Sequence, residues 1–227
     1  MREFRAEEGL KLLEEKREKF EIFRDLLLRY NEKYNLTAVT EEKDVLYKHF
    51  LDSVMGESLF PQGARVVEIG SGAGFPSIPL MLVRGDLHFT LIESTGKKCE
   101  FLRAAKTELS LNADVLNVRA EDAAKTELRE GFDCAVARAV ARMNTLTEYC
   151  LPFVKTGGVF IAYKGEAEEE IREAKKAVSV LGGKIESVNG FELPENYGKR
   201  TLVVIRKEKS TPAKYPRGNG KERKAPL

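Results

Sequence analysis

Residues 66–76 read Val-Val-Glu-Ile-Gly-Ser-Gly-Ala-Gly-Phe-Pro, and this stretch decides the fold. A short apolar run is followed by three glycines that alternate with small residues, and a helix-like segment begins at Ser77. Glycine at Gly70, Gly72 and Gly74 removes every Cβ from one turn, so a ligand can lie against bare backbone amides. The pattern predicts a strand, a ligand-binding loop and a helix; a tight turn without a ligand is the alternative.

The spacing of these glycines indicates which ligand the loop suits. It is G-x-G-x-G, not the G-x-G-x-x-G of dinucleotide-binding turns. With Glu68 just before the glycines, the segment resembles the S-adenosylmethionine (SAM) loop of Rossmann-like methyltransferases. The resemblance implies that the loop and the following helix N-terminus bind the methionine carboxylate of that cofactor.

Bulk composition indicates an ordinary globular chain. At 227 residues, with 42% hydrophobic and 33% charged residues, it can bury one substantial α/β core with appendages. No apolar run is long enough for a membrane span, and the charged start is not that of a secretory signal. Three cysteines without C-x-x-C spacing predict reduced thiols in a cytoplasmic protein, and two histidines make a metal site improbable.

Charge is distributed unevenly along the chain. Residues 206–227 carry eight basic residues against Glu208 and Glu222, a net charge of +6, whereas the first 205 residues carry −4. Prolines and glycines make this tail a poor helix or strand. The sequence therefore predicts a flexible basic arm over 208–227, which either solubilises the protein or contacts a polyanion.

The N-terminal region reads as helical. Six large apolar side chains fall at spacings of three, four or seven, which places them on one helix face that packs on the core: Leu13, Phe20, Phe23, Leu27, Tyr30 and Tyr34. A turn over 35–39 precedes a second helix, which is predicted from residue 41 or 42 to 60.

Strand and helix patterns then alternate. Strands are predicted at 65–69, 88–93, 114–119, 132–137 and 159–163, and helices at 77–84, 95–109, 123–129, 143–154 and 166–181. Two last strands, 184–191 and 201–206, are joined by a turn at 194–198. This order predicts an α/β fold with a mainly parallel seven-stranded sheet, helices on both faces and an antiparallel edge.

Ligands of open parallel sheets bind beyond the carboxyl ends of the strands, so the residues there are site candidates. Glu93 ends the second strand, 19 residues after Gly74, and can accept hydrogen bonds from both ribose hydroxyls. A glycine loop followed by an acid is shared with NAD-binding domains, so this pair does not separate the two cofactors. After the third strand, Glu121 is assigned to the adenine amino group and Asp122 to a helix N-cap.

The fourth strand ends at Arg138, where chemistry is expected. There is no Asp/Asn-Pro-Pro-Tyr/Phe motif for exocyclic amines and no Pro-Cys nucleophile. The guanidinium of Arg138 suits a carboxylate, a phosphate or a guanine edge, and a structural ion pair is the alternative. The pattern favours an acceptor that needs positioning rather than deprotonation. Guanine N7, which carries a lone pair and no proton, is permitted.

Taken together, the residues resemble the bacterial RsmG (GidB) family, which methylates N7 of a guanine in 16S ribosomal RNA. The markers run along nearly the whole chain and include Tyr34–Ala38, His49–Ser53, Glu68–Pro76, Ile78–Leu80, Gly96–Lys98, Phe101–Leu102, Ala137–Ala139, Tyr163–Gly165, Arg200, Val203–Ile205 and Thr211–Arg217. The resemblance implies a class I SAM-dependent fold, with an N-terminal helical extension (1–62), a methyltransferase domain (63–207) and a basic tail (208–227).

The resemblance also transfers site residues. It implies that Gly70, Phe75, Ala120, Glu121 and Arg138 bind SAM, whose product is S-adenosyl-L-homocysteine. Together with Gly72, Gly74 and Glu93 they make up the predicted cofactor site, in which Arg138 also positions the reactants without a general base. Glu68, Ala73 and Glu93 stand where many members have Asp, Pro and Asp, and Gly-Asn-Gly replaces Lys-Pro-Gly after Arg217. The tail is therefore the least secure transfer.

An RNA target gives the exposed cations a purpose. Guanine N7 lies in the deep, narrow major groove of an A-form duplex, so a loop or unstacked base is the expected substrate. Candidates for phosphate contacts are Lys97, Lys98, Arg142, Lys164 and Arg200. The expected partner is 16S rRNA or the small ribosomal subunit, bound by a monomer. Three alternatives remain: a small-molecule or protein methyltransferase, an assembly factor that binds SAM and RNA without transfer, and an NAD-linked oxidoreductase.

Overall fold

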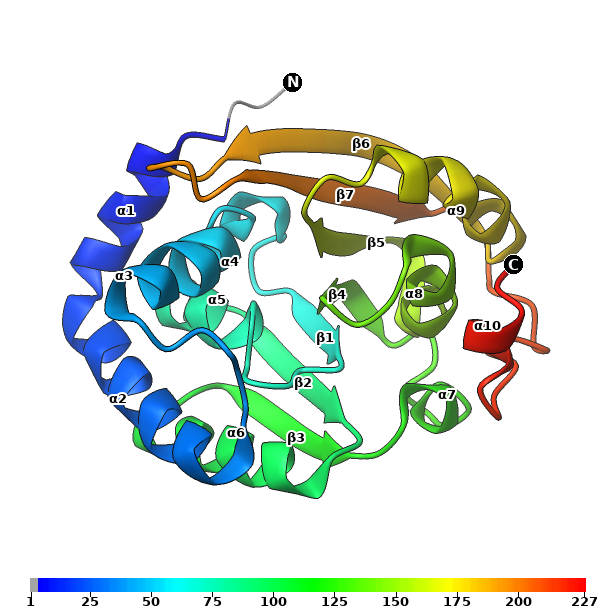
Figure 1. The fold of residues 1–227 in the computed structure, drawn as a ribbon. Coiled ribbons are helices and arrows are strands. Elements are labelled where there is room, and N and C mark those ends of the chain that lie inside the picture. The colour runs from blue at the N-terminus through cyan, green and yellow to red at the C-terminus, as the bar shows by residue number, and fades with distance from the viewer. Residues whose placement is uncertain (1–3) are drawn as a thin grey trace.

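A single twisted sheet forms the centre of the molecule (Figure 1). The computed structural model describes residues 4–227, and their seven strands lie in the order β3-β2-β1-β4-β5-β7-β6. The bounds are β1 Arg65–Ile69, β2 His88–Glu93, β3 Ala113–Asn117, β4 Phe132–Arg138, β5 Val154–Lys164, β6 Gly183–Glu192 and β7 Lys199–Lys207. Strand β7 alone runs antiparallel, to both β5 and β6, so the predicted mainly parallel sheet is confirmed.

Helices cover both faces of the sheet because successive strand residues point to opposite sides. Val66 belongs to one apolar cluster and Val67 to the other. The first face carries α5 (Ser77–Val83), α6 (Gly96–Glu108) and the N-terminal helices α1 (Ala6–Glu15) and α2 (Arg17–Tyr34). The second face carries α7 (Ala120–Ala123), α8 (Met143–Cys150), α9 (Glu168–Val180) and a 3₁₀ turn at Leu151–Phe153. A further 3₁₀ turn, Glu57–Leu59, lies on the first face.

The N-terminal helices are packed as the periodicity predicts. Phe20, Phe23 and Leu27 are buried on α2, and Phe23 stacks on Phe50 with ring centroids 5.5 Å apart. The predicted second helix is divided: α3 (Glu42–Asp44) continues into a π-helix at Val45–Leu51 and then α4 (Asp52–Val54). From this segment His49 contacts Arg138 at the end of β4.

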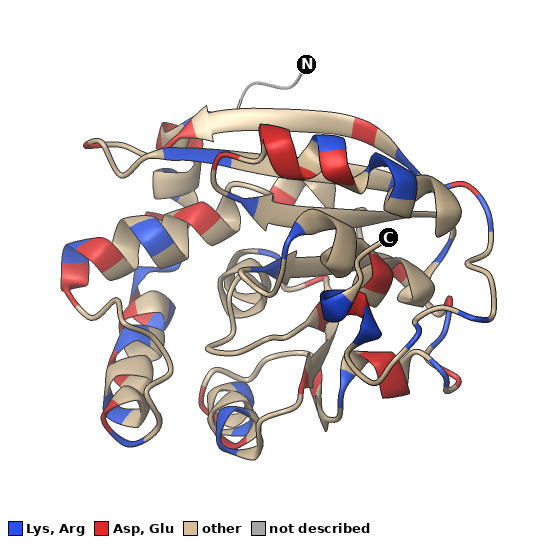
Figure 2. Cartoon of the chain, turned by 45° about the vertical axis from the view of Figure 1, so that its right-hand side comes forward, with Lys and Arg blue, Asp and Glu red and all other residues tan. Residues whose placement is uncertain are grey.

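The C-terminal segment differs from the predicted flexible arm. Thr211, Tyr215 and Glu222 are buried, and the Arg129 guanidinium donates to Thr211 O at 2.8 Å and to Tyr215 O at 2.9 Å. A short helix, α10 (Lys221–Lys224), also forms where none was predicted. Figure 2 shows its basic residues in blue near the C-terminus. The prediction failed because its partners lie far back in the sequence.

Two features of residues 4–227 bear on function. No helix in this range is long and apolar enough to cross a membrane. Within the same range, no group of three or more His, Cys, Asp or Glu side chains is arranged to hold a metal ion.

Candidate functional site

A cavity of about 800 Å³ opens at the carboxyl ends of β1, β2, β3 and β4. Four predicted cofactor residues line it, namely Gly70, Glu93, Ala120 and Glu121. Lys98, predicted to contact RNA, also lines it, whereas Gly72, Gly74, Phe75 and Arg138 lie outside its lining. The remaining lining residues were not predicted and include Arg119, Val140, Tyr149, Asn219, Gly220, Arg223 and Lys224. The predicted site is thus divided into a cavity and an adjoining polar cluster around Arg138.

The glycine loop shapes one wall of the cavity. Gly70 has φ +70°, and a Cβ there would lie 2.8 Å from Val140 Cγ2. Gly74 has φ +80°, and its Cβ would overlap the Ile78 side chain at the start of α5. Both positions therefore require glycine, for backbone conformation and for space.

The loop amides, however, are not bare. Gly70 N and Ser71 N both donate to Ile92 O, at 2.8 and 3.2 Å, and Gly74 N donates to Ser71 O at 2.7 Å. Gly72 N donates to Glu93 Oε2 at 3.0 Å. The prediction that these amides bind an anion is therefore wrong for these four donors. What the glycines contribute is close approach of the backbone to the cavity.

Glu93 lies at the carboxyl end of β2, where its carboxylate accepts hydrogen bonds. Its side chain is 6% exposed, and besides Gly72 N it accepts from Thr95 N at 2.8 Å, through Oε1. Two backbone donors thus hold the carboxylate in place. Each of its oxygens can still accept one more hydrogen bond. This geometry suits a pair of vicinal hydroxyls.

The loop after β3 was predicted with the wrong helix start. Helix α7 begins at Ala120, not at residue 123, and its N-cap is Arg119 without a side-chain cap hydrogen bond. The assignment of Asp122 to the cap is therefore wrong, and Asp122 lines the cavity beside Glu121. Two carboxylates and the first turn of α7 consequently face the cavity at this end.

Arg138 extends from the end of β4 toward the π-helix. Its Nη1 donates to Asp52 Oδ2 at 2.8 Å and to Lys48 O at 3.0 Å, and its side chain is 14% exposed. Asp52, 7% exposed, also pairs with Arg200 through Oδ1 at 3.3 Å. Both Asp52 oxygens are therefore occupied by guanidinium groups, and the ion-pair alternative for Arg138 is realised in the structure.

His49 completes this cluster as a neutral ring. His49 Nδ1 lies 3.1 Å from Arg138 Nη2 and 3.2 Å from Lys48 O. Nε2 lies 2.9 Å from Thr37 Oγ1, so both ring nitrogens have polar partners. The imidazole stacks on Phe75 at 4.3 Å, and Arg138 lies 5.0 Å above the same ring. Phe75 thus supports the cluster from below rather than lining the cavity.

Sequence reasoning did not assign roles to His49 and Asp52. The signal was present, since both belong to the His49–Ser53 marker. The two residues are three positions apart and therefore share one face of a helix. Their partner, Arg138, is set by the tertiary structure.

Glu68 lies beneath the glycine loop, 1% exposed. Ser77 Oγ donates to its Oε2 at 2.6 Å, while Oε1 has no hydrogen-bond partner. Burial raises the pKa of Glu68 to about 7, against smaller opposing effects of the hydrogen bonds from Ser77 and Ser71. An orphaned polar atom this close to the loop fits a site completed by a polar ligand group or water.

We expect Glu68→Gln and His49→Asn to change the pH dependence of stability in opposite directions. The raised pKa of Glu68, about 7 against 4.5 unfolded, stabilises the fold fully below pH 4.5, and this contribution is lost as pH rises through 7. Burial and Arg138 lower the pKa of His49 to about 4 from 6.5, so this residue makes stability rise between pH 4 and 6.5. Each of these differences in pKa between the folded and unfolded states corresponds to roughly 3 kcal/mol in the free energy of unfolding.

Urea denaturation at pH 4.5, 5.5 and 6.5 measures both effects. Relative to the wild type, the unfolding free energy of Glu68→Gln should rise with pH, and that of His49→Asn should fall. Parallel profiles for the three proteins would show that neither group titrates differently on folding.

The five RNA candidates have different surroundings. Lys97 is exposed beside the Tyr34 ring, at 5.9 Å, and Arg142 is 56% exposed although it pairs with Glu173 at 2.7 Å. Lys164 is 11% exposed and donates to Glu170 and to Ala141 O, each at 2.7 Å. This part-buried pair engages the Lys164 ammonium, and Asp52 likewise engages Arg200. The outward-facing candidates are thus Lys97 and Arg142.

The strand order with its reversed β7, the glycine loop after β1 and the acid at the end of β2 define a class I SAM-dependent methyltransferase. The fold is similar to that of Pyrococcus horikoshii TYW2 in complex with MeSAdo, with a TM-score of 0.56 and 18% identity. That likeness covers 68% of this chain and 61% of the TYW2 chain.

Residues 16–202 match the GidB family model, described as rRNA small subunit methyltransferase G, and the chain belongs to this family. It is 47% identical to ribosomal RNA small subunit methyltransferase G of Brevibacillus brevis, over 98% of this chain and 95% of that protein. It is 44% identical to the protein of the same name from Staphylococcus aureus (strain Newman), over 97% and 94%. The predicted family, the enzyme class and its cofactor, SAM, are thereby confirmed.

Proposed function

We propose that this protein transfers the methyl group of SAM to N7 of a guanine in 16S rRNA of the small ribosomal subunit. The names of the family and of its relatives support the rRNA substrate. One observation in the site carries the choice of N7. At the end of β4 the polar groups are already committed: His49 through both ring nitrogens and Asp52 through both oxygens.

A cluster without a free base suits an acceptor that has no proton to lose. Guanine N7 offers an in-plane lone pair, and displacement at the sulfonium methyl needs only in-line alignment at near-contact distance. Holding the two reactants in that geometry replaces acid–base catalysis as the main source of acceleration. The role proposed for Arg138, at the rim of this cluster, is to position the reactants.

The cavity residues suggest how the cofactor is oriented. Glu93 would accept from the ribose hydroxyls, and Ala120 and Glu121 would meet the adenine, as neutral and acceptor groups at the start of α7. Gly70 would let the cofactor pass close to the loop, with Gly72 and Gly74 keeping its conformation. The bound cofactor supplies an electrophilic methyl group and leaves as S-adenosyl-L-homocysteine.

The RNA surface is proposed for the same edge of the sheet. Lys97 and Arg142 flank the site and face outward. They would contact phosphates of an unpaired segment, because a base in a duplex does not expose N7 to a protein site. We also propose that the enzyme acts as a monomer in the cytoplasm, and the division into residues 1–62, 63–207 and 208–227 stays a prediction.

Transcripts that contain 7-deazaguanosine test the position of the methyl group. This analogue replaces N7 with a carbon and keeps the other edges of the base. We expect labelled methyl from SAM to reach 16S rRNA made with guanosine, free or assembled with small-subunit proteins, and not the 7-deaza form. Equal labelling of both would place the methyl elsewhere on the RNA. Absence of label from both, with SAM still bound, would favour a binding factor over an enzyme.

A further inference from the structure

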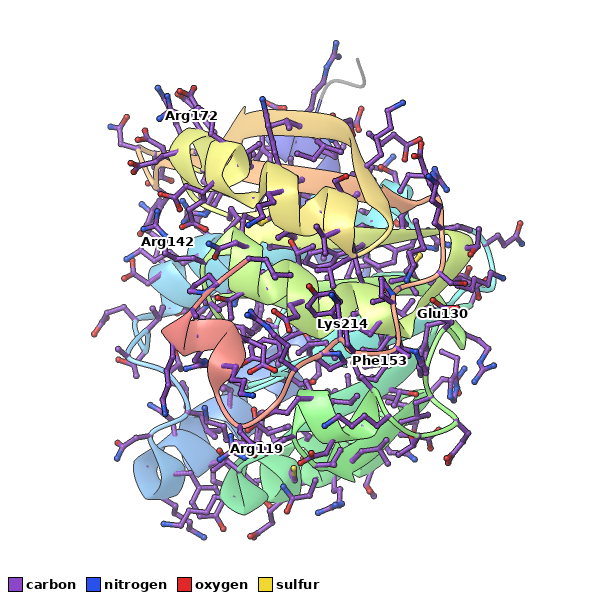
Figure 3. All side chains as sticks on the ribbon, turned by 90° about the vertical axis from the view of Figure 1, so that its right-hand side faces the viewer. Arg119, Glu130, Arg142, Phe153, Arg172 and Lys214 are labelled. Atoms are coloured by element: carbon purple, nitrogen blue, oxygen red, sulfur yellow. The ribbon has the colours of Figure 1, made fainter. Side chains whose placement is uncertain are left out.

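The cofactor cavity has a wall that comes from the far end of the chain. Asn219, Gly220, Arg223 and Lys224 line it together with Glu93 and the first turn of α7. In Figure 3 the C-terminal segment passes the labelled Lys214, runs across the face turned toward the viewer and turns near Arg119. The segment lies outside α8, whose Tyr149 also lines the cavity.

This segment is anchored by a buried ion pair. Arg217 donates through its backbone N and Nε to Glu148 Oε1, at 2.9 and 3.0 Å, and through Nη2 to Oε2 at 2.7 Å. The Glu148 side chain is 0% exposed. Three donors from one residue leave little freedom for the chain that follows.

One further contact fixes the segment on α8, and another closes the segment on itself. Thr145 Oγ1 donates to Glu222 O at 2.9 Å, and the fully buried Glu222 carboxylate accepts from Gly218 N. Between these contacts, Gly218, Asn219 and Gly220 all have positive φ, of 77°, 57° and 72°. Consecutive left-handed residues turn the backbone sharply, and the turn carries α10 to the cavity.

We propose that the segment 217–224, which we call the strap, forms the wall of the cofactor site at its adenine end through its lining residues, with Arg223 in contact with the adenosyl group. The proposal rests on the cofactor orientation given under the proposed function. Arg223 and Tyr149 both line the cavity, so the guanidinium and the tyrosine ring contribute to the same site. A planar cation beside a tyrosine suits the face of a purine ring.

Charge supports the same assignment. The opposite side of the cavity carries Glu93, Glu121 and Asp122. Arg223 and Lys224, together with Lys98 and Arg119, bring positive charge to the cavity and so lower the energy of the carboxylates that are proposed to bind ribose and adenine. The basic residues of the strap are thus proposed to bind the cofactor, whereas a charge count alone would have assigned these residues to RNA.

The chain offers a matched control for this proposal. Lys221 is on the same helix as Arg223, carries the same charge and is likewise exposed, but it is not part of the cavity lining. An RNA-binding arm would respond to the loss of either charge. A cofactor wall would respond only to the loss of Arg223.

The experiment measures the dissociation constant of S-adenosyl-L-homocysteine by calorimetry, without RNA, for the wild type and for Arg223→Ala, Lys221→Ala and Glu93→Gln. We expect Arg223→Ala to raise this constant about tenfold. Lys221→Ala should stay within about twofold of the wild type, since long-range charge is screened.

The outcomes separate the strap from the rest of the site. If Glu93→Gln weakens binding and Arg223→Ala does not, the strap assignment is wrong and the cofactor site stands. If neither variant weakens binding, the cavity is not the cofactor site, and both assignments fail. Equal weakening by Arg223→Ala and Lys221→Ala would overturn the strap in favour of a general effect of charge. This binding experiment contains no RNA and does not depend on methyl transfer to N7. A failure of the proposed N7 transfer would appear only in the experiment with 7-deazaguanosine.

Discussion

Arg138→Ala is expected to abolish methyl transfer and to destabilise the protein. The substitution leaves Asp52 buried, with Arg200 at 3.3 Å as its remaining cation, and removes the donor to His49 Nδ1. Breaking a buried ion pair from one side costs about 3–5 kcal/mol. Transfer should fall by ~100-fold or more, because small displacements of reacting atoms carry penalties of that size. Urea denaturation and single-turnover transfer at saturating SAM measure the two effects.

A double variant separates positioning from folding. In Arg138→Gln with Asp52→Asn, two neutral amides replace the buried ion pair, and Arg200, which loses its acidic partner, is 22% exposed and can be solvated. We expect most of the stability to return and the transfer rate to stay low. Normal transfer by this double variant would make Arg138 a structural residue. Arg206→Ala is the surface control, because its pair with Glu186 is exposed and should contribute less than about 1 kcal/mol.

Glu93→Ala is expected to weaken cofactor binding by about 100-fold, the equivalent of two lost hydrogen bonds to a charged acceptor. The substitution removes the proposed ribose acceptor and also leaves Gly72 N and Thr95 N without their partner. Glu93→Gln keeps one carbonyl oxygen and should lose roughly tenfold. Calorimetry with S-adenosyl-L-homocysteine gives both values.

The transfer rate distinguishes this role from a catalytic one. At saturating SAM, the single-turnover rate of Glu93→Gln should approach that of the wild type, because the ribose contact is uniform between ground and transition states. Glu108→Ala, an exposed acid on α6 paired with Arg29, serves as the control and should leave binding unchanged. Wild-type affinity in Glu93→Ala would remove Glu93 from the cofactor site.

Elements with strong local signals were predicted to the residue. The bounds of β1 and β2 are confirmed, because each is a short apolar strand that ends at a glycine or an acid. Strand β5 was predicted to begin at residue 159 but begins at Val154. Its first residues include Gly157 and Gly158 and read as a turn, yet Val154 pairs with Phe132 of β4 across a bulge. Pairing with a neighbouring strand overrode the local preference.

Charged residues were the least predictable part of the site. Lys164, Arg200 and the basic tail all read as surface cations, and each has an acidic or carbonyl partner in the fold. A charge run indicates that cations are present, but it does not indicate which of them are neutralised. The same applies to the loop amides, whose acceptors come from the end of β2.

By itself, the sequence determined the order of strands and helices, the glycine loop and the acid at the end of β2. These features follow from backbone conformation and hydrophobic periodicity within a few residues, so short stretches of sequence are enough to predict them. Only the tertiary structure decided that Arg138 pairs with Asp52, 86 residues earlier, and that the strap returns to Glu148 across 69 residues to close the cavity. Such contacts depend on which buried groups become neighbours when the strands and helices pack together, and a local sequence pattern does not determine these neighbours.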